Sequence, residues 1–89
     1  MARDIQLTLV GKPGCHLCDD AREVVQAVVA EFEQDASRRI SLDERSILDD
    51  EALRASYAEE IPVLLIDGEM HSYWRVDPVR LKTALCAKG

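Results

Sequence analysis

Residues 12–18 read Lys-Pro-Gly-Cys-His-Leu-Cys, and this stretch decides how the rest of the chain is interpreted. It follows a short apolar run, Ile5–Val10, and leads into a long amphipathic pattern that is typical of a helix. A Cys-x-x-Cys pair at such a junction places one thiol at the helix start and the second about one turn later. Unpaired backbone N–H groups and the helix dipole favour an anion at the first position. Cys15 is therefore expected to be a nucleophilic thiolate, with Cys18 close enough to form a disulfide with it.

The composition is that of an ordinary globular protein. The 89 residues suit one small domain, so a single domain over residues 1–89 is predicted. The net charge is −6 and no block of Lys and Arg exists, so a nucleic-acid partner is not expected. No apolar stretch has the length of a membrane span, and Met1–Asp4 lacks the pattern of a signal peptide. Three cysteines, an odd number, also argue against a secreted disulfide framework. A cytoplasmic monomer without a membrane partner is the expectation.

The periodicity of apolar residues predicts the order β-α-β-α-β-β-α, which is an α/β fold. The predicted strands are Ile5–Val10, Arg39–Asp43, Pro62–Ile66 and Glu69–Arg75. The predicted helices run from Leu17 to about Asp35–Arg38, from a cap at Asp49 to about Ala58, and from Asp77-Pro78 to about Ala87. Strands that are joined through helices are expected to be parallel, and the last two strands form a hairpin at Asp67-Gly68. A four-stranded mixed sheet with helices on both faces follows.

Two smaller patterns bear on the second and third helices. Leu48 and Leu53 flank the expected cap at Asp49 with the spacing of a hydrophobic staple. Val76 and Leu81 have a similar arrangement around Asp77-Pro78.

Three segments together carry a resemblance that covers nearly the whole chain. They are Pro13–Cys18 after the first strand, Ile61-Pro62-Val63 before the third, and Asp67-Gly68 in the hairpin. Placed in this order, they resemble the thioredoxin fold and specifically the glutaredoxin family, in particular short bacterial members with a Pro-Gly-Cys-x-Leu-Cys site. The resemblance implies a thioredoxin-like three-layer sandwich. It also implies a thiol–disulfide oxidoreductase in which Cys15 attacks and Cys18 resolves.

The same resemblance implies a set of substrate-binding residues. The Ile61–Pro62 bond would be cis, its loop would face Cys15, and the Ile61 backbone could pair with an extended peptide or glutathione. Lys12 matches a basic residue that contacts the glycine carboxylate of glutathione, although it could also be a solvated loop lysine. The full set adds Gly14, which shapes the turn, His16, and Asp77 at the start of the last helix.

The chain departs from the glutaredoxin pattern after the last strand. Family members usually carry a Gly-Gly pair there, which helps to hold the γ-glutamyl group of glutathione. This chain has Trp74-Arg75-Val76 instead, and the bulky side chains change the wall of that site. Glutathione is therefore one possible reductant, and a flavoprotein such as thioredoxin reductase is the other. No bound cofactor is expected, and the substrates are protein or low-molecular-weight disulfides.

Other readings of the same residues stay open. The cysteine pair could bind a metal, but a structural zinc site needs four ligands, and the remaining candidates, His16, His71 and Cys86, form no second spaced pair. An iron–sulfur cluster shared by two monomers is a further alternative. The chain could also be a thioredoxin-fold binding module without enzymatic activity. His16 either stabilises the neighbouring thiolate or is an exposed spacer. Cys86 is expected to be a partly buried inert thiol, Trp74 a core or pocket-rim residue, and His71 a surface residue.

Overall fold

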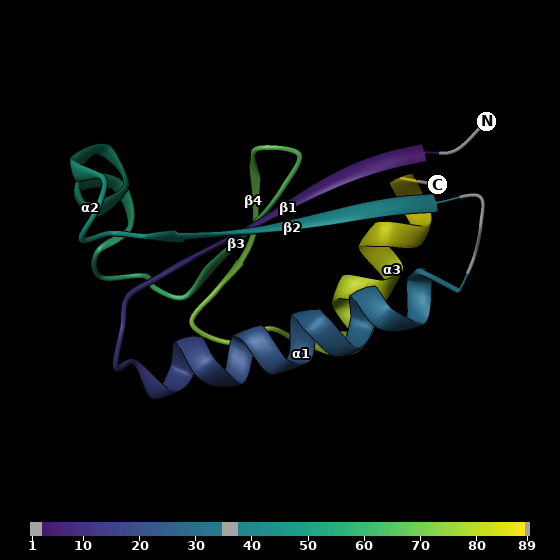
Figure 1. The fold of residues 1–89 in the computed structure, drawn as a ribbon, viewed down its shortest axis with the longest axis horizontal. Helices are drawn as coiled ribbons and strands as arrows, with labels where there is room; N and C mark the ends of the chain where they lie inside the picture. The colour runs from purple at the N-terminus through teal and green to yellow at the C-terminus, as the bar shows by residue number, and fades with distance from the viewer. Residues whose placement is uncertain (1–2, 35–37, 89) are drawn as a thin grey trace.

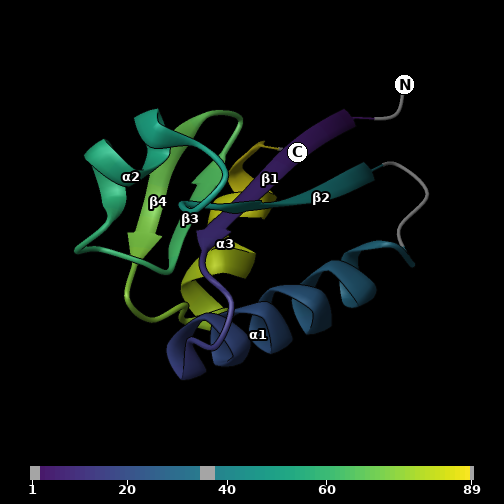
Figure 2. The same cartoon turned by 60° about the vertical axis from the view of Figure 1, so that its left-hand side comes forward.

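The computed structural model describes residues 3–34 and 38–88, and its elements follow the predicted order (Figure 1). They are β1 (Arg3–Gly11), α1 (His16–Phe32), β2 (Arg38–Ser46), α2 (Glu51–Tyr57), β3 (Val63–Ile66), β4 (Glu69–Tyr73) and α3 (Pro78–Lys88). The strands form one mixed sheet in the order β2-β1-β3-β4. Helices α1 and α3 cover one face of the sheet, and α2 lies on the other (Figures 1 and 2). The predicted α/β sandwich is confirmed.

Two apolar clusters fill the spaces between these layers. On the face of α1 and α3, alternate residues of β1 meet the apolar stripe of α1 and the inner side of α3. The main members of this cluster are Ile5, Leu7, Leu9, Val25, Val28, Leu64, Leu81 and Leu85. On the other face, Leu53 and Tyr57 of α2 pack against Val10, Val63 and Leu65. All four residues of β3 are therefore buried, as the continuous apolar run predicts.

The expectation that helix-connected strands are parallel is correct for β1 and β2 but wrong for β3. Strand β3 runs antiparallel to β1, with Val10 opposite Val63. The reason is the short connection between β2 and β3. Helix α2 has seven residues and lies near the end of the sheet at which β2 finishes (Figure 1). Because the chain does not return along the length of the sheet, β3 starts from that same end and runs in the direction opposite to β1 and β2.

The predicted cap of the second helix is also wrong by one residue. Asp50 is the N-cap, and its carboxylate accepts hydrogen bonds from the N–H groups of Ala52 (2.9 Å) and Leu53 (3.2 Å). Asp49 belongs to the preceding turn, where its N–H donates to the carbonyl of Ser46. The same turn directs Leu48 to solvent, with 67% of its surface exposed, so the predicted staple with Leu53 does not form.

The observed strand boundaries differ from the predicted ones where polar residues interrupt the apolar pattern of a strand. Strand β2 continues to Ser46 rather than Asp43, because it pairs with β1 along its whole length. Strand β4 ends at Tyr73, because Trp74 adopts a left-handed backbone conformation with φ 65°. The first helix ends at Phe32, and residues 35–37 of its predicted end lie outside the described residues.

The turn and the start of the last helix agree with the sequence. Asp67 and Gly68 both have positive φ (51° and 85°), as a tight hairpin turn requires. Helix α3 begins at Pro78, and Val76 and Leu81 are both buried in the core beside it.

Candidate active site

The cysteine pair lies at the start of α1, where the sequence places it. Cys15 is the N-cap residue with an extended backbone (φ −98°, ψ 116°), and its side chain is partly exposed. Its Sγ accepts a hydrogen bond from the backbone N–H of Cys18 at 3.2 Å. Because this N–H has no partner within the helix, the sulfur takes the place of a capping oxygen. The start of the helix thus holds the Cys15 sulfur in a fixed and partly exposed position.

Cys18 has a different environment from its neighbour. It is buried, with 2% of its surface exposed. Burial raises the pKa of the Cys18 thiol from about 9 to about 11, and the hydrogen bond with the Cys15 side chain adds to the shift. A backbone hydrogen bond from Lys12 acts in the opposite direction but does not cancel it. At neutral pH Cys18 is therefore a protonated, sheltered thiol, and Cys15 is the accessible sulfur.

This difference predicts the order in which the thiols are alkylated. In a reduced Cys86→Ser variant at pH 7 to 8, we expect iodoacetamide to modify Cys15 and to leave Cys18 largely unmodified. With a pKa of about 11, only about one Cys18 in a thousand is ionised at pH 8. Labelling of Cys18 should rise as the pH approaches 11, because a raised pKa delays formation of the thiolate. Peptide mass spectrometry measures both sites, and equal labelling at pH 7 would contradict the assignment.

The structure adds Gly11 to the site, a residue that the sequence analysis did not select. A Cβ atom at Gly11 would lie 2.8 Å from the Cys18 Sγ and 3.2 Å from its Cβ. Contacts that short are not tolerated, so only glycine leaves room for the buried thiol. The single visible signal was a glycine at the end of the apolar run, four residues before Cys15.

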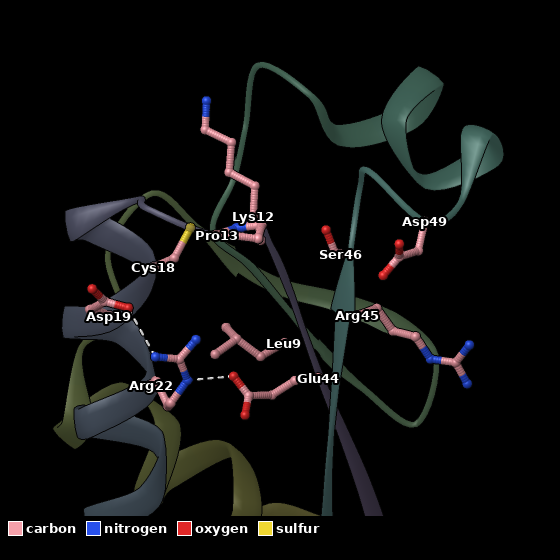
Figure 3. Close-up of a pocket in the computed structure, with 11 residues that line it drawn as sticks. Leu9, Lys12, Pro13, Cys18, Asp19, Arg22, Glu44, Arg45, Ser46 and Asp49 are labelled. Carbon is pink, nitrogen blue, oxygen red and sulfur yellow. Dashed lines mark hydrogen bonds and ion pairs between the residues drawn. The ribbon is translucent and has the colours of Figure 1, made fainter.

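A cleft of about 350 Å³ opens beside Cys18, between α1, the loop after β1 and the end of β2 (Figure 3). Across it, Arg22 of α1 forms an ion pair with Glu44 of β2, and it forms a second one with Asp19 on its own helix (2.9 Å). The Arg22–Glu44 pair ties the first turns of the cysteine-bearing helix to the edge strand. Lys12 lies at the rim, and its ammonium group extends away from the cleft (Figure 3).

The Ile61–Pro62 loop approaches the cysteine loop as a consequence of the sheet. The bond is cis, which confirms that prediction. Val10 near the end of β1 is directly paired with Val63 at the start of β3. The loop that leaves β1 toward Cys15 and the loop that enters β3 through Ile61 therefore lie side by side at the same end of the sheet. Pro62 is buried there, and Ile61 is partly exposed.

The remaining predicted site residues are exposed, and they have different local roles. Gly14 has φ +75°, a conformation that suits glycine in the turn before α1. Among the described residues, no hydrogen bond or ion pair of the Lys12 or His16 side chain is present, and both project into solvent. The Asp77 carboxylate accepts hydrogen bonds from the N–H groups of Val79 (2.9 Å) and Arg80 (3.3 Å), so it caps α3.

A second pocket, of about 270 Å³, lies between the first turns of α1 and the segment after β4. It is lined by Leu17, Asp20, Ala21, Val24, Trp74, Arg75 and Val76. Trp74 is 54% exposed, so of its two expected roles the structure shows the pocket rim and not the core.

Two expectations about single side chains are wrong. Cys86 is exposed rather than partly buried, because it lies beside the apolar stripe of α3 and not on it. His71 is half-buried, because a bulge in the β3–β4 pairing displaces it from regular alternation. Burial and the nearby Arg80 lower the pKa of His71.

Neither a cluster of metal-ligating side chains nor a membrane-spanning helix is present in the part of the chain that the structure describes. Residues 3–34 and 38–88 contain no group of three or more His, Cys, Asp or Glu that could hold a metal ion. No described helix has the length and apolar character that crossing a bilayer requires.

Comparison with known proteins places this geometry in a family. The model of the glutaredoxin-like domain (DUF836) matches residues 6–86. The chain belongs to this glutaredoxin-like family. Uncharacterised proteins of Mycobacterium tuberculosis and Mycobacterium bovis are 34% identical to the glutaredoxin-like protein over 77 residues, which cover 86% of this chain and 78% of theirs.

Solved structures agree on the fold. The X-ray structure of a structural-genomics target protein from X. campestris has a TM-score of 0.68 and 31% identity, and covers 91% of this chain and 96% of its own. A mutant thioredoxin from Halobacterium salinarum has a TM-score of 0.62 and 21% identity, covering 97% of this chain and 75% of its own. The glutaredoxin-like protein thus has the thioredoxin fold, and its family supports a redox function.

Proposed function

We propose that this glutaredoxin-like protein is a thiol–disulfide oxidoreductase that works through Cys15 and Cys18. The observation that carries the proposal is the hydrogen bond from the Cys18 N–H to the Cys15 Sγ at the start of α1. It fixes an accessible sulfur at the helix start, and the second thiol is held next to it in a protonated form. Two neighbouring cysteines in unlike environments are what a two-step exchange needs.

The reaction proceeds by two successive displacements. The Cys15 thiolate attacks one sulfur of a substrate disulfide, forms a mixed disulfide and releases the other sulfur as a thiolate. Cys18 then loses its proton and attacks the Cys15 Sγ, so the Cys15–Cys18 disulfide forms and the second substrate thiolate leaves. The substrate gains two electrons, and the two cysteines lose them. An external thiol or a flavoprotein must return these electrons before the next cycle.

The residues around the dithiol bear on the source of electrons. Lys12 is exposed at the rim and can approach a carboxylate, as glutathione binding would require. Trp74 and Arg75 occupy the place of the family's glycine pair, which favours a flavoprotein such as thioredoxin reductase. Either source belongs to a reducing, cytoplasmic setting, and the proposed substrates are protein or small disulfides.

A coupled assay with both electron sources tests the proposal. Purified Cys86→Ser protein is given a disulfide substrate with NADPH, and with either glutathione plus glutathione reductase or thioredoxin reductase. We expect NADPH oxidation in at least one of the two systems. If NADPH is oxidised in neither system, and circular dichroism shows that the protein is folded, the protein is not an oxidoreductase. A non-enzymatic binding module would then be the remaining interpretation.

A further inference from the structure

Strand β2 forms one edge of the sheet and has nine residues, which is long for a strand. It pairs with β1 over its whole length. The sheet order β2-β1-β3-β4 leaves its outer side without a neighbouring strand in residues 3–34 and 38–88. In a parallel pair, alternate residues direct their N–H and C=O groups away from the partner. The outer side of β2 therefore presents a row of backbone donors and acceptors that another strand can pair with.

The two faces of β2 differ in character. Ile40 is buried among the residues of α1 and α3, and Leu42 is half-buried against the same cluster. Alternate residues point to the opposite face of the sheet, where Arg39 is exposed and Asp43 forms an ion pair with Arg45 (2.7 Å). Residues 39–45 contain two arginines and two acidic residues, so this segment is neutral although the chain has a net charge of −6. A second β2 strand can approach this edge without a repulsion of like net charges.

The charges of β2 are arranged so that the strand is complementary to itself. Two copies related by a two-fold axis pair as antiparallel strands, and the residue on the axis faces its own copy. With Ser41 on the axis, Arg39 of each copy lies opposite Asp43 of the other. Opposite charges at directly facing positions stabilise an antiparallel pair. On the other face of the sheet Ile40 lies opposite Leu42, and this contact covers the part of Leu42 that a single chain leaves exposed.

The neighbouring registers lack this complementarity. An axis at Leu42 places Arg39 opposite Arg45, and an axis at Asp43 places two carboxylates face to face. Like charges directly opposite one another destabilise a strand pair. An axis at Ile40 shortens the paired stretch to residues 38–42, whereas an axis at Ser41 pairs residues 38–44. Among the described residues, the Ser41 register is therefore the longest one without like charges at facing positions.

We propose that this glutaredoxin-like protein forms a two-fold symmetric dimer through the outer side of β2, which joins the two four-stranded sheets into one. A dimer takes the place of the monomer expected from the sequence, because a run of mixed charges does not reveal that it forms a sheet edge. The cysteines at the start of α1 lie outside the paired stretch, so the dimer does not depend on the proposed redox function. The contact is small, so the dimer dissociates on dilution.

An exchange of charges tests the interface. Sedimentation velocity over a dilution series of reduced Cys86→Ser protein measures the dissociation constant of the dimer. We expect this constant to rise about tenfold or more in Arg39→Asp and in Asp43→Arg, because each variant places like charges opposite one another at two symmetric positions. The double variant restores opposite charges and should return the constant toward its starting value. Glu69→Arg changes an exposed charge of β4 at the other edge of the sheet by the same amount as Asp43→Arg, and it should not weaken the dimer.

Oxidative cross-linking tests the register. Ser41→Cys, made in the Cys86→Ser protein, places a thiol on the axis, where facing Cα atoms are about 4.5–5.5 Å apart and a disulfide can form. Arg39→Cys is the matched control, because the two copies of this position lie about 13 Å apart along the strands. We expect mild oxidation to give a covalent dimer of Ser41→Cys on a non-reducing gel, with the bridge at position 41 by mass spectrometry. Arg39→Cys should remain largely monomeric.

The contrary results are equally definite. A monomer mass at every concentration would refute the dimer, and a dimer that Arg39→Asp and Asp43→Arg leave unchanged would show that β2 is not the interface. Equal cross-linking of Ser41→Cys and Arg39→Cys would refute the Ser41 register. None of these measurements depends on redox activity, so the proposed function is tested separately.

Discussion

A Cys15→Ser variant is expected to lose disulfide reductase activity by about a thousand-fold or more, down to the uncatalysed background. Serine keeps the size and the capping position of Cys15, so the fold should be unchanged. Its hydroxyl is not ionised near neutral pH and cannot form the mixed disulfide. The measurement is kcat/KM with a peptide disulfide in a coupled NADPH assay, and Cys86→Ser is the control that should keep full activity. Retention of activity by Cys15→Ser would show that Cys15 is not the nucleophile.

The partner variant Cys18→Ser should stop the reaction half-way. The first displacement needs only Cys15, so substrate should attach to the protein as a mixed disulfide that is not resolved internally. Intact-protein mass spectrometry then shows the mass of one substrate half added to Cys18→Ser but not to Cys15→Ser. If both variants, or neither, trap the substrate, the assigned roles of the two cysteines are wrong.

A Gly11→Ala variant is expected to destabilise the protein by about 1–3 kcal/mol, because the added methyl group overlaps a packed sulfur. The Cβ would lie 2.8 Å from the Cys18 Sγ, so the thiol or the strand must move. Thermal or urea unfolding of the reduced protein measures the loss. A movement of Cys18 should also increase its alkylation at pH 8, which a simple loss of stability in another region would not do.

A double-mutant cycle separates this contact from backbone effects. Cys18→Ala removes the sulfur, so Gly11→Ala should cost less in that background than in the wild type, although the 3.2 Å contact with the Cys18 Cβ remains. Gly14→Ala is the matched control. Its cost comes from φ +75° and no atom lies within 4 Å of the new methyl group, so Cys18→Ala should not change it. Additive free energies for Gly11→Ala and Cys18→Ala would refute the proposed contact.

Local patterns predicted most of the fold, and long-range pairing accounts for what they missed. The stripe of α1 and the Asp77-Pro78 start of α3 are properties of neighbouring residues, so they can be read directly. The direction of β3 depends on where the chain re-enters the sheet, which no short window contains. The end of β2 has charged residues because it is an edge strand, and its pairing with β1 leaves no apolar signal.

In the candidate site, too, some parts follow from local sequence motifs and others depend on long-range contacts. The cysteine pair and the Ile61–Pro62 loop follow from sequence motifs, and the structure places both at one edge of the sheet. Gly11 could not be selected, because its importance depends on a sulfur that reaches it only after α1 packs on β1. The Arg22–Glu44 ion pair joins α1 to β2, and the fixed position of Trp74 depends on carbonyls of a distant loop. Neither arrangement has a spacing that a motif could reveal.

The pairing of Val10 with Val63 also has a consequence for protein synthesis. The ribosome releases the two cysteines early, together with the helix that carries them. The loop that stands beside them is made much later, after β2 and α2. A half-made chain therefore carries its cysteine pair, on α1, before β3 and the loop that stands beside that pair can join the sheet.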